Sequence, residues 1–248
     1  MRFDDARPPN GRRPSPFAAW RGAAWAYVAL FALAGFAFWP KYLSQLGGPI
    51  DPYTHAHAIV ATGWCLLLVA QPLLATRDVA AHRALGLATY ALAPAFVLAA
   101  VLLAHARFRA MDEATFRQEA PTLFLPLSAA LLFSVSFFLA VRHRRETPLH
   151  ARLMVLTGLP MIDPVLGRVL FFFLPPLPHP LLYQAVTFGL TDLVVLLMFF
   201  VPPASARVRR AYAAPAALFV LAHAFWFTLA QGPAWVPFAA WFRSLPLP

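Results

Sequence analysis

Seven apolar blocks, each about long enough to cross a bilayer, limit what this chain can fold into. They cover residues 22–40, 53–75, 85–105, 121–141, 149–174, 181–202 and 212–231. A helix needs about 20 apolar residues to span the hydrocarbon core, and there it satisfies its backbone polar groups within one segment. We therefore predict an all-α integral membrane bundle of seven transmembrane helices, forming a single domain over residues 22–231.

The positive charges lie in alternate connections between these blocks. Arginines gather in the N-terminal tail and in the second, fourth and sixth connections: Arg2, Arg7, Arg12, Arg13, Arg21, Arg77, Arg83, Arg142, Arg144, Arg145, Arg152, Arg207, Arg209 and Arg210. Because cytoplasmic loops carry the excess of arginine and lysine, we predict a cytoplasmic N-terminus and an outer C-terminus in a cell membrane, taken as a bacterial inner membrane. The net charge of +10 then reflects topology and contact with anionic membrane lipids, not nucleic-acid binding.

The two ends of the chain are expected to lie outside the bundle. Residues 1–21 are polar and rich in arginine and proline, which predicts a disordered cytoplasmic tail before an uncleaved first span. Residues 232–248 are expected to form a short outer C-terminal tail.

Four ionisable residues in the last three apolar blocks predict a buried polar site. Asp163 lies between two prolines in the fifth block, and Arg168 follows about one turn later. Asp192 and His223 lie near the centres of the sixth and seventh blocks. A charge at mid-bilayer costs roughly 2.5–3.5 kcal/mol on insertion scales, so such groups pair or serve a function. We predict that Arg168 pairs with Asp192 and that the four side chains form one network.

The fifth block is also predicted to be a broken helix. Gly158, Pro160, Pro164 and Gly167 follow one another closely, and each proline removes a backbone N–H and leaves a carbonyl without its helical partner. Broken membrane helices line cavities or pack inside a bundle, and transporters hold substrates and ions on them at mid-bilayer. The alternative is a kinked helix whose charges only serve packing.

A second polar stripe is predicted on the second block. Asp51 is placed to cap this helix. His57, Trp64 and Gln71 are seven residues apart and therefore share one face, whereas His55 lies on the opposite face. Interfacial histidines at the outer membrane surface are the simpler interpretation of the two imidazoles.

Two histidine–arginine groups lie at the cytoplasmic boundary. His82 precedes Arg83 at the start of the third block, and His150 and Arg152 open the fifth. Contact with lipid phosphates explains both groups. The sharper hypothesis is that His82 and His150 meet on one internal face.

Several of these residues form an ordered set that resembles a bacterial family of predicted multi-spanning membrane proteins, marked by H-x-H, a Q and H-R-x-x-G in its first helices. The matching residues are His55, His57, Trp64, Gln71, His82, Arg83, Gly86, His150, Arg152 and Met154. The resemblance covers about residues 50–170. It implies an all-helical bundle and draws attention to the motif residues, but it implies no activity.

The broken helix and the buried charges favour a protein that handles protons, a cation or a small polar solute. Asp163 and Asp192 would exchange protons or bind the cation, Arg168 would hold one carboxylate ionised, and His223 would relay protons. The identity of the small ligand or ion, and whether the protein is an enzyme, are left open.

The alternative is a membrane redox protein that binds haem or a metal through its histidines. His57 and His105 are the candidates for a single haem near the outer side. No H-x-x-x-H or H-E-x-x-H pair occurs, which disfavours a metal site within one helix.

Two further alternatives remain open. The topology is similar to that of the ceramidase and adiponectin-receptor group of zinc hydrolases, but Phe219 and Phe227 stand where that group has paired histidines. In a non-catalytic membrane assembly protein, the buried charges would only specify helix packing.

Overall fold

The computed structural model describes residues 20–202 and 205–248, and within these ranges the chain is helical and has no strand. The elements are α1 (Arg21–Phe38), η2 (Leu43–Gln45), α2 (Pro52–Arg77), α3 (Val79–Arg109), α4 (Glu113–Glu119), η3 (Ala120–Leu123), α5 (Phe124–Arg142), α6 (Thr147–Leu156), η4 (Leu159–Met161), α7 (Ile162–Phe173), α8 (Leu181–Leu197), α9 (Ala206–Thr228) and α10 (Trp235–Ser244). Most of the predicted cytoplasmic tail, residues 1–19, lies outside the described ranges.

Several helices have the length and composition of membrane spans. Five segments are long and apolar enough: Pro52–Arg77, Val79–Arg109, Glu113–Arg142, Thr147–Phe173 and Ala206–Thr228. Gly22–Phe38 and Leu181–Leu197 are shorter apolar helices. The fold is therefore an all-helical membrane bundle with at least five membrane-length segments in the part that the structure describes.

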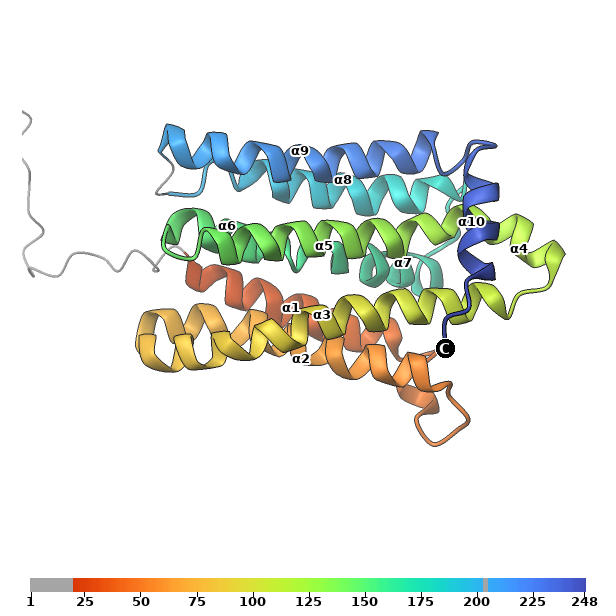
Figure 1. The fold of residues 1–248 in the computed structure, drawn as a ribbon, viewed down its shortest axis with the longest axis horizontal. Helices are drawn as coiled ribbons and strands as arrows, with labels where there is room; N and C mark the ends of the chain where they lie inside the picture. The colour runs from red at the N-terminus through yellow and green to blue at the C-terminus, as the bar shows by residue number, and fades with distance from the viewer. Residues whose placement is uncertain (1–19, 203–204) are drawn as a thin grey trace, which may run out of the picture.

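The long helices run side by side between two ends of the bundle (Figure 1). α2 packs along α1 and α3, α5 packs along α3 and α6, and α7 lies between α1 and α8. α9 contacts α5, α6 and α8. The α2–α3, α5–α6 and α8–α9 turns lie at one end, whereas the α3–α4 and α9–α10 connections lie at the other (Figure 1).

The first of these ends holds most of the arginines, and we call it the arginine-rich end. Its turns and helix ends carry Arg77, Arg83, Arg142, Arg144, Arg145, Arg207, Arg209 and Arg210. Two acidic residues of the described chain, Asp78 and Glu146, lie there. At the opposite end, arginines such as Arg117 and Arg243 are balanced by acids such as Asp112 and Glu113.

Short polar side chains begin several of the long helices. Asp51 accepts the backbone N–H of Thr54 at 2.8 Å and precedes the first-turn proline of α2, which confirms the predicted cap. Asp78 caps α3 through the N–H of Ala81 at 2.9 Å. These caps satisfy backbone donors that have no partner inside a helix.

The fifth apolar block is broken, as its prolines predict. α6 ends before the turn η4, and α7 begins directly after it. Tyr27 of α1 is buried and donates its hydroxyl to the Val155 carbonyl at 2.6 Å, so a carbonyl next to the break has a partner. Gly158 lies against the same tyrosine: a Cβ added there would overlap the ring and come within 2.7 Å of its hydroxyl oxygen.

The C-terminal segment is not the simple tail predicted for residues 232–248. It contains α10, which lies across the end of the bundle opposite the arginine-rich end (Figure 1). α10 buries Trp235 and Phe242 against the bundle, and the indole Nε1 of Trp235 donates to the Ala120 carbonyl at 2.9 Å. Aromatic residues recur on one face of this segment, and burying that face outweighs its short length.

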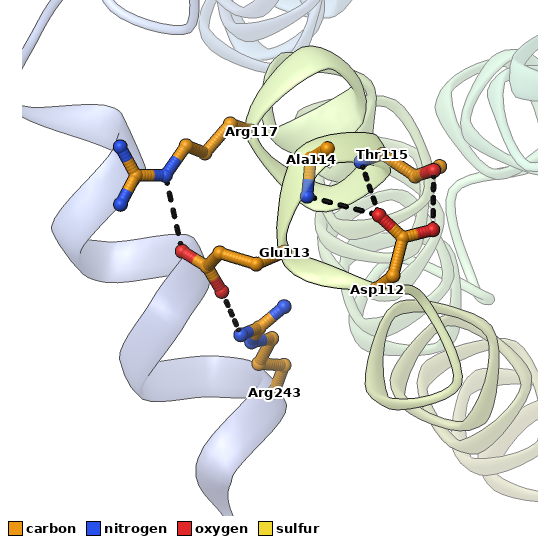
Figure 2. Close-up of polar contacts among 6 residues, drawn as sticks. All are labelled: Asp112, Glu113, Ala114, Thr115, Arg117 and Arg243. Carbon is orange, nitrogen blue, oxygen red and sulfur yellow. Dashed lines mark hydrogen bonds and ion pairs between the residues drawn. The ribbon is translucent and has the colours of Figure 1, made fainter.

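Glu113 fastens α4 to α10 at the same end (Figure 2). It accepts hydrogen bonds from Arg117 at 3.1 Å and from Arg243 of α10 at 2.5 Å. The Arg243 guanidinium also lies 3.8 Å from the centre of the Phe116 ring. An ion pair between Glu113 and Arg243 therefore holds α10 on the bundle in addition to the buried apolar face of α10.

The first turn of α4 should loosen in acid. Asp112 accepts the N–H groups of Thr115 and Ala114, both at 2.9 Å (Figure 2). The bond from Thr115 is the main cause that lowers the pKa of this carboxyl below its ordinary value of about 3.9. The cap is therefore complete at neutral pH and is lost as the pH falls through the lowered pKa, below about 4.

Hydrogen exchange at these two amides, corrected for the intrinsic pH dependence of exchange, should show protection that declines only in that acidic range. Asp112→Asn keeps a capping oxygen without a titrating group, so protection in this variant should not depend on pH. An equal acid-induced decline in both proteins would contradict the assignment to Asp112.

Candidate functional site

Asp163 lies where the broken helix resumes, in the first turn of α7. Its Oδ1 accepts a hydrogen bond from the Thr187 hydroxyl at 2.6 Å and another from the Gln184 amide at 3.2 Å. Thr187 is completely buried, and both donors belong to α8. These two donors give one oxygen of the carboxyl group hydrogen-bond partners inside the apolar bundle.

A second polar pair joins α8 to α9. The Asp192 Oδ1 lies 2.8 Å from the Nδ1 of His223, whose side chain is 11% exposed. The Phe188 ring stacks on the His223 imidazole with the ring centres 4.1 Å apart and the planes 7° apart. The imidazole is thus held between a carboxylate of α8 and the face of an aromatic ring of the same helix.

Asp163 of α7 and His223 of α9 both bind to one stretch of α8. We call this set of residues the central polar site: Asp163, Gln184, Thr187, Thr191, Asp192 and His223. Thr187 and Asp192 are five residues apart, about 7.5 Å along the helix. Between them, the Thr191 hydroxyl donates to the Thr187 carbonyl at 2.9 Å.

Arg168 does not form the predicted pair with Asp192; among the described residues it forms no ion pair with either carboxylate. Its guanidinium donates to the Pro164 carbonyl at 2.8 Å and lies 4.5 Å from the Phe38 ring centre. Arg168 lies on the side of α7 that faces α1, where its guanidinium contacts Phe38. The Asp192 carboxyl group is instead paired with His223.

The predicted stripe on α2 divides into two different environments. His57 stacks on Phe96, with ring centres 5.4 Å apart, and Trp64 packs edge-on against Phe133 at 4.8 Å. Gln71 is buried and lies beside His82, one helix away. His57 and Trp64 of the stripe therefore make aromatic contacts, whereas Gln71 makes a polar contact.

Gln71 connects the two motif segments of α2 and α3. In the amide orientation that satisfies both groups, its nitrogen donates to His82 and its oxygen accepts the Gly86 N–H at 3.1 Å. The ring Nδ1 of His82 also lies 3.2 Å from the Gln71 carbonyl. The glutamine, the histidine and the glycine of the resemblance thus share one structural contact, while Arg83 is exposed.

His150 and Arg152 serve packing at the arginine-rich end. The His150 Nδ1 donates to the Ala140 carbonyl at 2.8 Å. Arg152 is completely buried and donates to three backbone carbonyls, including that of Met198 at 3.0 Å. Arg152 was expected at the lipid surface, and that expectation was wrong, because its guanidinium turns inward to the end of α8.

His55, His57 and His105 lie toward the opposite end. His55 contacts the Tyr42 hydroxyl at 3.1 Å. His105 is completely buried and donates through Nε2 to the Leu245 carbonyl at 3.0 Å, which holds the C-terminal segment. His57 is level with Phe96, and His105 is nine residues farther along α3, about 13 Å. The two candidate haem ligands therefore have separate partners in the structure: His57 packs on an aromatic ring, and His105 is bound to the C-terminal segment.

Among the described residues, no three histidine, cysteine, aspartate or glutamate side chains gather closely enough to hold a metal ion. The central polar site instead contains hydroxyl, amide, carboxylate and imidazole groups. Thr187 was missed in the sequence because a threonine in an apolar helix has no distinctive signal. Its spacing of three residues from Gln184 and four from Thr191 could have placed it on the polar face.

No protein-family model, no curated protein and no solved structure matches this chain. The resemblance carried by the histidine, glutamine and arginine motifs therefore stays a prediction.

Proposed function

We propose that this chain is a seven-span cell-membrane protein whose central polar site handles protons, alone or together with a cation or a small polar solute. The observation that carries the proposal is the arrangement on α8. α8 holds Asp163 of α7 through Thr187 and, five residues farther and on another side of the helix, presents Asp192 to His223 of α9. Two carboxylates and one imidazole are thus brought together inside a bundle of membrane-length helices.

The chemistry of these groups suits proton exchange. Histidine is the side chain whose charge ordinarily changes near neutral pH, and the Nδ1 of His223 lies within hydrogen-bond distance of the Asp192 carboxyl group. Asp163 is held by donors without a formal charge, so it can release or accept a proton without breaking an ion pair. A proton arriving at His223 would convert the Asp192–His223 contact into a full ion pair and change the field at Asp163.

The charge distribution supports the proposed orientation. The arginine-rich end would face the cytoplasm, because arginine and lysine are retained on that side. With seven spans, the N-terminus would be cytoplasmic, and α10 would lie at the outer surface. The central polar site would then lie between the two surfaces, on the side of its bundle where the fifth block is broken.

Proton flux into liposomes containing the purified chain and a trapped pH-sensitive dye tests the proposal. Under an imposed membrane potential, the wild-type protein should acidify the interior faster than protein-free liposomes do. Asp163→Asn and Asp192→Asn should each reduce this flux about tenfold or more, because each removes a proton-binding group. Both substitutions retain shape and hydrogen-bonding capacity.

Glu119→Gln is the matched control, since it neutralises a carboxylate at the end of the bundle and should leave the flux unchanged. A wild-type flux equal to that of empty liposomes, or one that both aspartate substitutions leave unaltered, would exclude a proton role. The buried charges would then serve helix packing only.

A further inference from the structure

A groove runs along the outside of the bundle between α5 and α9 and ends against α10. Its volume is about 280 Å³. Leu131 of α5 and Leu221 and Phe225 of α9 form its walls, and Trp235 and Phe238 of α10 close one end. The wall residues are about half exposed, so the groove opens to the outside of the bundle.

The groove lining offers no free hydrogen-bonding side chain to a polar ligand. Ser128 and Trp235 are the groove residues with polar side chains, and both are already satisfied: Ser128 donates to the Leu125 carbonyl at 3.1 Å and Trp235 to the Ala120 carbonyl at 2.9 Å. Apolar cavities of about 150 Å³ stay dry and bind hydrocarbons such as benzene. This groove has nearly twice that volume.

The aromatic residues of α10 indicate how deep the groove would lie in a membrane. The helix lies across the end of the bundle (Figure 1), and its rings form a ladder, with Trp235–Phe238 centres 4.8 Å apart and Phe238–Trp241 centres 5.6 Å apart. Trp241 is 56% exposed. Tryptophan is enriched where lipid headgroups meet the hydrocarbon core, so the closed end of the groove lies near the headgroups and its length runs into the hydrocarbon.

We propose that this groove holds one acyl chain of a membrane phospholipid and that α10 lies flat in the headgroup layer, with Trp241 beside the glycerol region of that lipid. The groove is continuous with the exposed apolar sides of α5 and α9, which are membrane-length helices. An acyl chain therefore reaches it without leaving the bilayer. The proposal does not depend on the central polar site.

Lipid retention tests the proposal. Native mass spectrometry of the protein, purified from native membranes with delipidating detergent washes, should show one phospholipid bound to each chain. Leu221→Trp places a large ring into the groove from its exposed rim and should reduce retention about fivefold or more. Val220→Trp adds the same ring at the neighbouring exposed position, which does not line the groove, and should leave retention unchanged.

A fluorescence measurement tests the position of α10 separately. The difference in emission between the wild-type protein and Trp241→Phe reports Trp241, and lipids brominated near the glycerol should quench it more strongly than lipids brominated deep in the chain. Stronger deep quenching would overturn the proposed placement. Equal retention by wild type and Leu221→Trp, or a wild type without lipid, would overturn the acyl-chain site. A dimer that Leu221→Trp converts to a monomer would also overturn it, by showing that a second copy fills the groove.

Discussion

Replacing Arg152 with alanine should lower the free energy of unfolding by about 2–5 kcal/mol, because it leaves buried carbonyls without donors and creates a cavity. Arg152 is 0% exposed, and its guanidinium donates to the carbonyls of Met198 at 3.0 Å, Pro148 at 2.7 Å and Val201. Met198 and Val201 follow the last residue of α8, where carbonyls have no helical partners. The substitution would remove these donors and leave a cavity between α6 and α8.

Unfolding by denaturant in mild detergent, followed by circular dichroism, measures this effect. Arg144→Ala is the matched control, because Arg144 is exposed and donates to the nearby Val141 carbonyl, and it should change stability by less than about 0.5 kcal/mol. Arg152→Lys keeps the charge but loses the planar set of donors, so its stability should lie between the wild type and the alanine variant. Equal stabilities for Arg144→Ala and Arg152→Ala would show that the buried guanidinium does not brace α8.

Adding a single methyl group at Gly158 should destabilise the protein by about 1–3 kcal/mol, as overpacking does in a filled core. A Cβ there would overlap the Tyr27 ring and lie 2.8 Å from the Leu68 Cδ1. The tyrosine would have to move, and its 2.6 Å hydrogen bond to the Val155 carbonyl would weaken. The expected damage is therefore greatest at the break between α6 and α7.

Gly35→Ala should instead increase stability when it is measured in the same assay. Gly35 lies within α1, and a Cβ added there would meet no atom of the described chain within 4 Å, so alanine should stabilise the helix by about 0.5–1 kcal/mol. Tyr27→Leu should also reduce the cost of Gly158→Ala, because it removes the ring that obstructs the methyl group. Equal responses at both glycines would contradict a tight contact at the break.

The helical membrane fold and the break in the fifth block follow from the sequence, because block length and proline chemistry act locally. Asp51 could likewise be recognised as a cap from its position before Pro52. The Asp192–His223 contact was part of a predicted network, since both residues are ionisable groups within apolar blocks. These features need only composition, spacing and the polarity of the surroundings.

The partners of Arg168 and Arg152 could not be predicted, because they depend on how helices are rotated about their axes. Both guanidinium groups bind backbone carbonyls. Every residue has such a carbonyl, so the sequence does not indicate which ones an arginine will bind. α10 was missed for a related reason: its ten residues are too few to resemble a span. Its burial depends on Ala120 and Phe124, far away along the chain.

The two side-chain attachments of α8 also bear on how the chain enters a membrane during synthesis. α8 has 17 residues, fewer than the roughly 20 that a lone span requires, and it carries an aspartate that disfavours insertion. The partner of Asp163 leaves the ribosome after Asp163 itself, and His223 emerges later still. If α8 is one of the proposed seven spans, we expect it to integrate securely only after α9 has been made. A nascent chain arrested before residue 206 should then hold its last hydrophobic segment only loosely in the bilayer.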